Sequence, residues 1–239
     1  MKQLPVPKRI LLKLSGEALQ GKWEYGIETE FLDSLAKKIV TLTKEKDIEV
    51  VIVIGGGNIF RGVSGAAKGL DRTAADYMGM LATVINGIAL GNAIEKAGQS
   101  VRIMSAIEIS KVAELFIYRR ALKHLREKRI IIVVAGTGNP YFTTDSAAVL
   151  RALELHCDFM VKGTKVDGVY DKDPAKFPDA KRYDKVSVDD ALSKWLRIMD
   201  QSAIALAKDE RLPLFVCRIE DIDQIGSPDI RGTYVYVNE

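Results

Sequence analysis

The amino-acid sequence predicts an α/β protein, a three-layer α/β/α sandwich in which helices cover both faces of a mainly parallel central sheet. Short aliphatic runs alternate along the chain with longer amphipathic segments, an order typical of parallel strands joined by helices. Several runs are built of Val, Ile and Leu without alternation, as expected for strands buried on both faces. Because no linker rich in Pro or Ser interrupts the 239 residues, we expect a single domain spanning 1–239.

The expected strands are the short aliphatic runs, whose lengths suit strands of a globular protein. In chain order they are Arg9–Leu14, Glu49–Ile54, Val101–Met104, Ile130–Ala135, Asp158–Lys162, Leu214–Cys217 and Tyr234–Val237.

The expected helices are longer segments whose apolar residues recur at helical spacing; in the first, Leu32, Leu35 and Ile39 fall on one stripe. They are Glu28–Lys46, Asp71–Ala97, Leu115–Lys128, Asp145–His156 and Asp200–Glu210. The polar stretch Asp167–Lys185 contains two prolines, and we expect it to form an exposed loop.

Composition excludes several classes of protein. Hydrophobic residues make up 47% and charged residues 28% of the chain, which argues against a disordered chain, a collagen-like chain or a membrane bundle. The 35 Lys and Arg residues exceed the 32 Asp and Glu residues by only 3, too few to indicate a nucleic-acid binder. Cys157 and Cys217 form no CxxC pair and the two histidines have no metal-binding spacing, so we expect neither disulfides nor structural zinc.

The N-terminal segment has no recognisable targeting signal. Its apolar stretch is interrupted at Lys13, too early for the apolar region of a signal peptide. The longest aliphatic run, Ile130–Ala135, is much shorter than a membrane-spanning helix requires. The sequence therefore predicts a soluble protein of the reducing cytoplasm.

Three of the expected strands end in glycine or small polar residues. These ends are Lys13–Gly16, Gly55–Asn58 and Gly136–Pro140. Ligands of parallel α/β sheets bind beyond the carboxyl ends of the strands. Glycines at three such ends would let a ligand approach the backbone closely, and backbone N–H groups there favour an anion such as phosphate.

The common nucleotide-binding signatures are absent. The spacing G-x-x-x-x-G-K occurs at Gly16–Lys22, but the next residue is Trp23 rather than the Ser or Thr that holds magnesium in a P-loop. The dinucleotide pattern GxGxxG fails because Phe60 and Tyr141 stand where its last glycine belongs. No G-x-S-x-G elbow occurs either, so an α/β-hydrolase is not supported.

Four charged residues lie near these strand ends, although each also has an ordinary structural explanation. Lys13 interrupts a buried strand; it either extends its ammonium to solvent or directs it at phosphate oxygens. Asp145 could simply be an aspartate at the start of a helix, which is a common position for this residue. Asp76 could face solvent from a helix, and Arg61 could be an ordinary surface arginine. Taken together, they favour a phosphate-bearing ligand.

Five motifs resemble those of the bacterial UMP kinases, a family of the amino-acid-kinase superfamily, in order over nearly the whole chain. The block GTGNPYFTTDSA is the most discriminating and separates this family from the carbamate, glutamate and aspartate kinases. The motifs are Lys13–Leu19 (KLSGEAL), Ile54–Gly62 (IGGGNIFRG), Met78–Ala82 (MGMLA), Gly136–Ala147 (GTGNPYFTTDSA) and Thr164–Tyr170 (TKVDGVY), followed by Asp173-Pro174.

The resemblance implies ATP-dependent phosphorylation of UMP to UDP by direct in-line transfer, a step of pyrimidine nucleotide biosynthesis. It assigns catalytic roles to Lys13, Arg61, Asp145 and Lys162, with Asp145 organising the active-site lysines. Asp145 is paired with Lys162, although Lys165 is close enough in sequence to compete for that role. The residues implied for ATP are Lys13, Leu14, Ser15, Gly16, Gly57, Arg61, Thr164, Tyr170 and Asp173. Those implied for UMP are Gly56, Asp76, Thr137, Gly138, Asn139, Pro140, Tyr141, Phe142, Thr143 and Thr144.

The resemblance also implies a division of labour along the chain, with UMP bound by roughly 1–157 and ATP by 158–239. Mg²⁺ would be carried with ATP, so no protein ligand for the metal is named. Family members form homohexamers, are activated by GTP and are inhibited by UTP. The segment Gly21–Gly26, where family members respond to GTP, is one of their more variable parts. The apolar helix expected at Asp71–Ala97 is either a subunit contact or a core helix covered on both sides.

Two alternatives to a UMP kinase remain at this point. One is a kinase of another small acid, such as carbamate or N-acetylglutamate, within the same superfamily. The other is a non-catalytic regulator that senses nucleotides or associates with nucleic acid. The joint presence of Lys13, Arg61 and Asp145 and the small net charge argue against the second.

Overall fold

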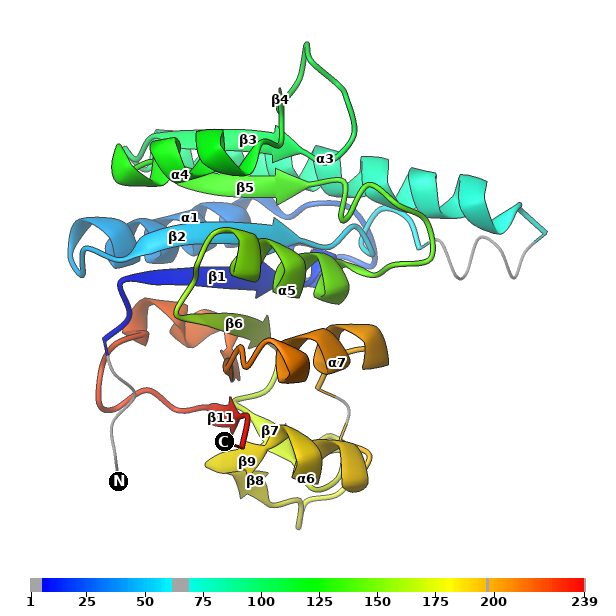
Figure 1. Cartoon of the computed structure of the whole chain (residues 1–239), viewed down its shortest axis with the longest axis vertical. Helices are drawn as coiled ribbons and strands as arrows, with labels where there is room; N and C mark the ends of the chain where they lie inside the picture. The colour runs from blue at the N-terminus through cyan, green and yellow to red at the C-terminus, as the bar shows by residue number, and fades with distance from the viewer. Residues whose placement is uncertain (1–5, 62–68, 197, 239) are drawn as a thin grey trace.

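The computed structural model describes residues 6–61, 69–196 and 198–238, and its centre is a sheet in the order β4-β3-β5-β2-β1-β6-β10-β11-β9 (Figure 1). All neighbouring strands in this sheet are parallel except β10 and β11, which confirms a mainly parallel sheet. The strands are β1 Arg9–Leu14, β2 Glu49–Ile54, β3 Val101–Ser105, β4 Glu114–Leu115, β5 Ile130–Val134, β6 Phe159–Thr164, β9 Lys185–Ser187, β10 Leu214–Arg218 and β11 Thr233–Tyr236.

Helices cover both faces of the sheet, which confirms the three-layer α/β/α class. In Figure 1, α1 and α3 lie behind the strands, and α5 and α7 lie in front of them. The helices are α1 Thr29–Lys44, α3 Arg72–Lys96, α4 Tyr118–Arg126, α5 Thr144–Glu154, α6 Val188–Ser193 and α7 Gln201–Asp209. Two 3-10 helices, η1 Gly16–Ala18 and η2 Ile219–Gln224, follow the ends of β1 and β10.

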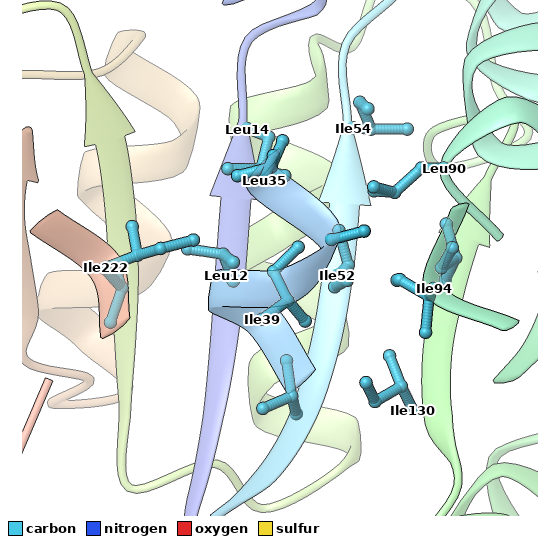
Figure 2. Close-up of a cluster of buried hydrophobic side chains, with 14 of the residues drawn as sticks. Leu12, Leu14, Leu35, Ile39, Ile52, Ile54, Leu90, Ile94, Ile130 and Ile222 are labelled. Atoms are coloured by element: carbon cyan, nitrogen blue, oxygen red, sulfur yellow. The ribbon is translucent and has the colours of Figure 1, made fainter. Parts of the chain in front are cut away.

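Successive residues of each strand belong to two separate hydrophobic layers, because side chains alternate between the two faces of a sheet. Figure 2 shows part of the layer behind the sheet, where Leu12 and Ile52 pack against Ile39 of α1 and Ile94 of α3. Leu11, Val51 and Ile131 point to the opposite layer, under α4, α5 and α7. By this alternation Lys13 belongs to the same face as Leu11 and lies beneath α5.

The structure corrects the sequence-based boundaries in the short elements. The stretch Asp167–Lys185 is not a plain loop, since it contains a small antiparallel pair, β7 Val169–Tyr170 with β8 Arg182–Tyr183, and ends at β9. The helix expected from Leu115 begins at Tyr118, because Leu115 pairs with Ser105 in β4. Helix α6 was not predicted. Elements of two to six residues contain too few positions to show a periodic pattern.

Helix α3 is buried on one side only, so it is not a core helix covered on both sides. Its inner residues, Leu90 and Ile94 among them, are fully buried against the sheet. An outer stripe remains exposed and consists of Tyr77, Met78, Leu81, Ile85 and Ile88. The helix is long and apolar enough to span a membrane, but 56% of its apolar window is buried against the rest of the structure.

Candidate active site

A buried cluster of three charged side chains lies where β1, β6 and α5 meet. Lys13 and Lys162 are paired in register on neighbouring parallel strands, so both side chains leave the same face of the sheet. Asp145 in the first turn of α5 lies between them. Its Oδ1 is 2.6 Å from Nζ of Lys13 and its Oδ2 is 2.9 Å from Nζ of Lys162.

Burial and charge compete in setting the protonation of this cluster. Burial raises the pKa of Asp145, but the two neighbouring ammonium groups outweigh it and hold the pKa of the carboxyl below its usual range. Burial lowers the pKa of Lys162, and the positive charge of Lys13 lowers it further. The negative charge of Asp145 raises this pKa but does not outweigh the other two effects. Near neutral pH the cluster therefore holds an ionised carboxylate.

The structure decides between the alternatives left open for two lysines. Lys13 is 8% exposed and bonded to Asp145, so it does not extend to solvent from the strand end. Lys162 also donates to the backbone oxygen of Ile198 at 2.5 Å, whereas Lys165 is exposed. Lys162 is therefore the lysine that shares the carboxylate with Lys13.

A cavity of about 290 Å³ lies beside the start of α5 and gathers many of the residues expected for UMP. Its walls come from the turn after β2, from α3 and from the loop between β5 and α5. The residues predicted for UMP among its lining are Gly56, Asp76, Thr137, Phe142, Thr143 and Thr144. Gly57 and Arg61, which were predicted for ATP, also line this cavity and not the larger one.

Asp76 joins α3 to the loop of this cavity and is not a solvent-facing helix residue. Its Oδ2 accepts from Nε of Arg72 at 2.9 Å and from the backbone N–H of Tyr141 at 2.8 Å. Tyr141 has a positive φ of 72°, and the guanidinium of Arg72 lies 5.2 Å from its ring centre. Because no hydrogen bond from the described residues reaches Oδ1 of Asp76, that oxygen is available as an acceptor.

The glycines at the strand ends differ in what they do. A Cβ on Gly16 would lie 2.6 Å from the backbone oxygen of Gly55, and one on Gly56 would lie 2.8 Å from Ala82. These glycines are needed for close packing inside the chain. A Cβ on Gly57 would meet nothing closer than 3.6 Å, and its φ is not positive. Gly57 thus leaves room beside the cavity, as does Gly136, where a Cβ would meet nothing within 4 Å.

A second, larger cavity of about 630 Å³ lies on the other side of the ion cluster and is open to solvent. Lys162 lines it, together with three residues expected for ATP, Thr164, Tyr170 and Asp173. The hydroxyl of Tyr170 donates to Oδ1 of Asp167 at 2.6 Å; this bond raises the pKa of Tyr170 and lowers that of Asp167. Apolar residues, among them Val166 and Val216, complete the wall.

Other predicted residues lie near the cavities without lining them. The side chain of Leu14 is fully buried in the core, so only its backbone could meet a ligand. Ser15 caps the short helix η1 by accepting from the N–H of Glu17 at 3.3 Å. Gly138, Asn139, Pro140 and Tyr141 belong to the loop that borders the smaller cavity, but they do not form its wall.

Asp200 lies beside the start of α5 and was not among the predicted residues. It caps α7, and it accepts hydrogen bonds from the hydroxyls of Thr143 and Ser146 at the start of α5. Burial opposes its ionisation, but these hydrogen bonds and that of Ser202 outweigh it and lower its pKa. Asp200 therefore ties the loop of the smaller cavity to the segment that holds Lys162. Its place at the start of a predicted helix was the only signal in the sequence.

Glu17 is a second residue that was not predicted. Its carboxylate pairs with the guanidinium of Arg61, which is 56% exposed at the mouth of the smaller cavity. Arg61 also donates to the backbone oxygen of Gly57 at 3.4 Å. Arg61 is therefore directed toward the glycine turn, and its partner is a carboxylate that an incoming phosphate could replace.

A model described as the amino acid kinase family matches residues 8–218. The chain belongs to the amino acid kinase family.

Relatives within the family are similar over most of their length. A uridylate kinase of Roseobacter denitrificans is 55% identical over 233 residues, which cover 97% of this chain and 96% of the relative. One of Wolinella succinogenes is 57% identical over 212 residues, which cover 88% of each.

Solved structures agree with the family assignment. The UMP kinase from Bacillus anthracis superposes with a TM-score of 0.92 at 36% identity, covering 99% of this chain and 98% of that structure. The UMP kinase from Ureaplasma parvum gives a TM-score of 0.90 at 35% identity, covering 99% and 100%. The resemblance drawn from the motifs is confirmed.

Proposed function

We propose that this protein is an enzyme that transfers the γ-phosphoryl group of MgATP to UMP, giving UDP and ADP, as a step of pyrimidine nucleotide biosynthesis. The Lys13–Asp145–Lys162 cluster carries this proposal because it connects the two cavities. Lys162 lines the larger cavity, and Asp145 directly follows Thr144 of the smaller one. Kinase relatives named for uridylate or UMP support the choice of acceptor.

We assign UMP to the smaller cavity and ATP to the larger one. The described lining of the smaller cavity comes entirely from residues 56–144, and that of the larger from residues 162–216. The sheet divides in the same way, since β1 to β5 lie on one side of the β1–β6 boundary and β6, β9, β10 and β11 on the other. The arrangement supports a UMP-binding part of roughly 1–157 and an ATP-binding part of 158–239.

The transfer needs no catalytic base. The phosphate of UMP is largely ionised near neutral pH because its second pKa is about 6. One of its oxygens would bond to the γ-phosphorus in line with the leaving oxygen, and the electrons of the broken bond would remain on ADP. The ammonium groups of Lys13 and Lys162 and the guanidinium of Arg61 would stabilise the charge of the two approaching polyanions. Asp145 holds the two lysines in place.

Mg²⁺ enters this scheme as part of the substrate MgATP. No group of three or more His, Cys, Asp or Glu side chains with metal-binding geometry occurs among the described residues. Asp145 already bonds two ammonium groups. Because Mg²⁺ commonly keeps waters and substrate phosphates as ligands, this donor set fits a metal held mainly by ATP.

The decisive experiment is a coupled assay of ADP release with MgATP and a panel of acceptors. We expect turnover with UMP and little with carbamate or acylamino acids. Preferred turnover of a small acid would instead indicate another kinase of the family. Tight binding of UMP without any turnover would indicate a nucleotide-sensing regulator.

Substitution of Asp76 tests the position of UMP. In Asp76→Asn the amide oxygen can still accept from Tyr141 or Arg72, but the amide nitrogen then faces the cavity as a donor. This amide nitrogen could not accept hydrogen bonds from the ribose hydroxyls. We expect the KM for UMP to rise about tenfold, the effect of one lost hydrogen bond to a charged group, with the KM for ATP nearly unchanged. An equal rise of both KM values would show that α3 had been disturbed.

We further propose that the protein assembles into a homohexamer in the cytoplasm through the exposed stripe of α3, which includes Leu81 and Ile85. Apolar surface of this kind is typical of subunit contacts. Light scattering in solution should report a mass of about six chains; a monomer would exclude the proposal. GTP activation and UTP inhibition remain part of the proposal, and rates measured with and without each nucleotide would test them.

A further inference from the structure

Trp195 has an exposure that folding alone does not explain. It is 82% exposed, although an indole normally buries much of its large apolar surface. Its positive φ of 54°, one residue after the C-cap of α6, is the ordinary helix ending of this chain and is shared by Lys128, His156 and Arg211. The exposed indole is therefore the feature that needs an explanation.

Trp195 lies at the wall of the larger cavity. It lines this cavity together with Leu196 and Ile198, the residue whose backbone oxygen bonds Lys162. Tyr170 of the β7–β8 pair contributes to the same wall. The indole is therefore part of a partly aromatic wall that leads to the ammonium of Lys162.

The other aromatic residues of this wall already have partners. The ring of Tyr170 is fixed by the bond of its hydroxyl to Asp167. Phe177 has the ammonium of Lys172 5.4 Å from its ring centre. No aromatic ring or cation of the described residues lies against the indole of Trp195, so its face is available to a ligand.

We propose that Trp195 stacks on the base of the phosphate donor and makes this site favour purine over pyrimidine nucleotides. Stacking of a base on an aromatic side chain is strong enough to change affinity substantially, and the two fused rings of a purine cover more of an indole than a single pyrimidine ring does. Binding would also remove exposed apolar surface of the indole from water. The inference rests on the proposed function, because it takes the larger cavity as the ATP site.

The test uses Trp195→Ala, Trp195→Leu and Trp195→Phe in the full-length protein. Leucine keeps apolar volume without an aromatic face, and phenylalanine keeps a smaller aromatic face. Leu192→Ala is the matched control, because Leu192 is an exposed residue of α6 that does not line the larger cavity. The chain has two tryptophans, so Trp23→Phe leaves Trp195 as the only indole emitter. Calorimetry measures ADP and UMP binding, and steady-state assays compare ATP with CTP as donor.

We expect Trp195→Ala and Trp195→Leu to weaken ADP binding about tenfold. The ratio of kcat/KM with ATP to kcat/KM with CTP should fall by a similar factor. Trp195→Phe should retain most of the affinity, UMP binding should not change, and Leu192→Ala should match the parent protein. In Trp23→Phe, ADP should change the emission of Trp195.

Unchanged ADP affinity and an unchanged ATP-to-CTP ratio in Trp195→Ala would overturn the inference and leave the proposed kinase activity standing. An equal loss of ADP affinity in Trp195→Phe and Trp195→Ala would also overturn the inference, because it would show that an aromatic face does not matter. If the parent protein bound no ADP at all, the proposed function would fail together with the inference.

Discussion

Replacing Lys13 with alanine should lower kcat by roughly 10²–10³, the usual effect of removing one preorganised electrostatic contact from a transition state. The ammonium of Lys13 is buried beneath α5 and shares the carboxylate of Asp145 with Lys162. It would act on charge at the transferred group rather than on the base or ribose of either nucleotide. The KM for UMP should therefore change much less than kcat.

Lys165→Ala is the matched control for this experiment. Lys165 lies three residues beyond Lys162 in the same part of the chain, but its side chain is exposed. Rates should be measured in a coupled ADP assay and thermal unfolding followed in parallel, because Asp145 keeps only one of its two partners in Lys13→Ala. A rate within a few-fold of the parent protein would mean that the buried Lys13 has a structural role only.

Local patterns in the sequence made the charged residues candidates, although each also had an ordinary structural explanation, and the family resemblance supplied their proposed roles. Lys13 interrupts the aliphatic run Ile10–Leu14, and Asp145 follows two threonines at the start of a helix. The alternation of strands and helices indicated the parallel sheet, and the carboxyl ends of parallel strands meet at one edge. The three glycine-rich turns were therefore expected at the same edge of the sheet.

Local patterns could not show which charges pair, since pairing depends on register between strands far apart in the chain; only the family resemblance implied that Asp145 meets the lysines. Lys13 and Lys162 are 149 positions apart but face each other across the β1–β6 pairing. The contact of Glu17 with Arg61 and that of Asp200 with Thr143 likewise join distant segments. Glutamate and aspartate are common at helix starts and on surfaces, so no local pattern distinguishes Glu17 or Asp200.

The remaining strong prediction concerns the choice of pyrimidine. UMP should be used far better than CMP, with a ratio of kcat/KM that can reach roughly 10⁴. Uracil presents a C4 carbonyl and an N3–H donor, whereas cytosine presents an amino group and a bare N3 acceptor. A site whose polar groups match the first pattern leaves them unpaired against the second, and unpaired buried groups are costly.

We expect this choice to be made by the loop between β5 and α5, which borders the smaller cavity. Thr137, Phe142 and Thr144 line that cavity, and Asp76 fixes the loop through the backbone N–H of Tyr141. Initial rates should be measured for UMP and CMP at one fixed concentration of MgATP, and the KM for ATP should be the same with either acceptor. Comparable kcat/KM values for UMP and CMP would show that this loop does not read the base, even if Lys13 behaved as expected.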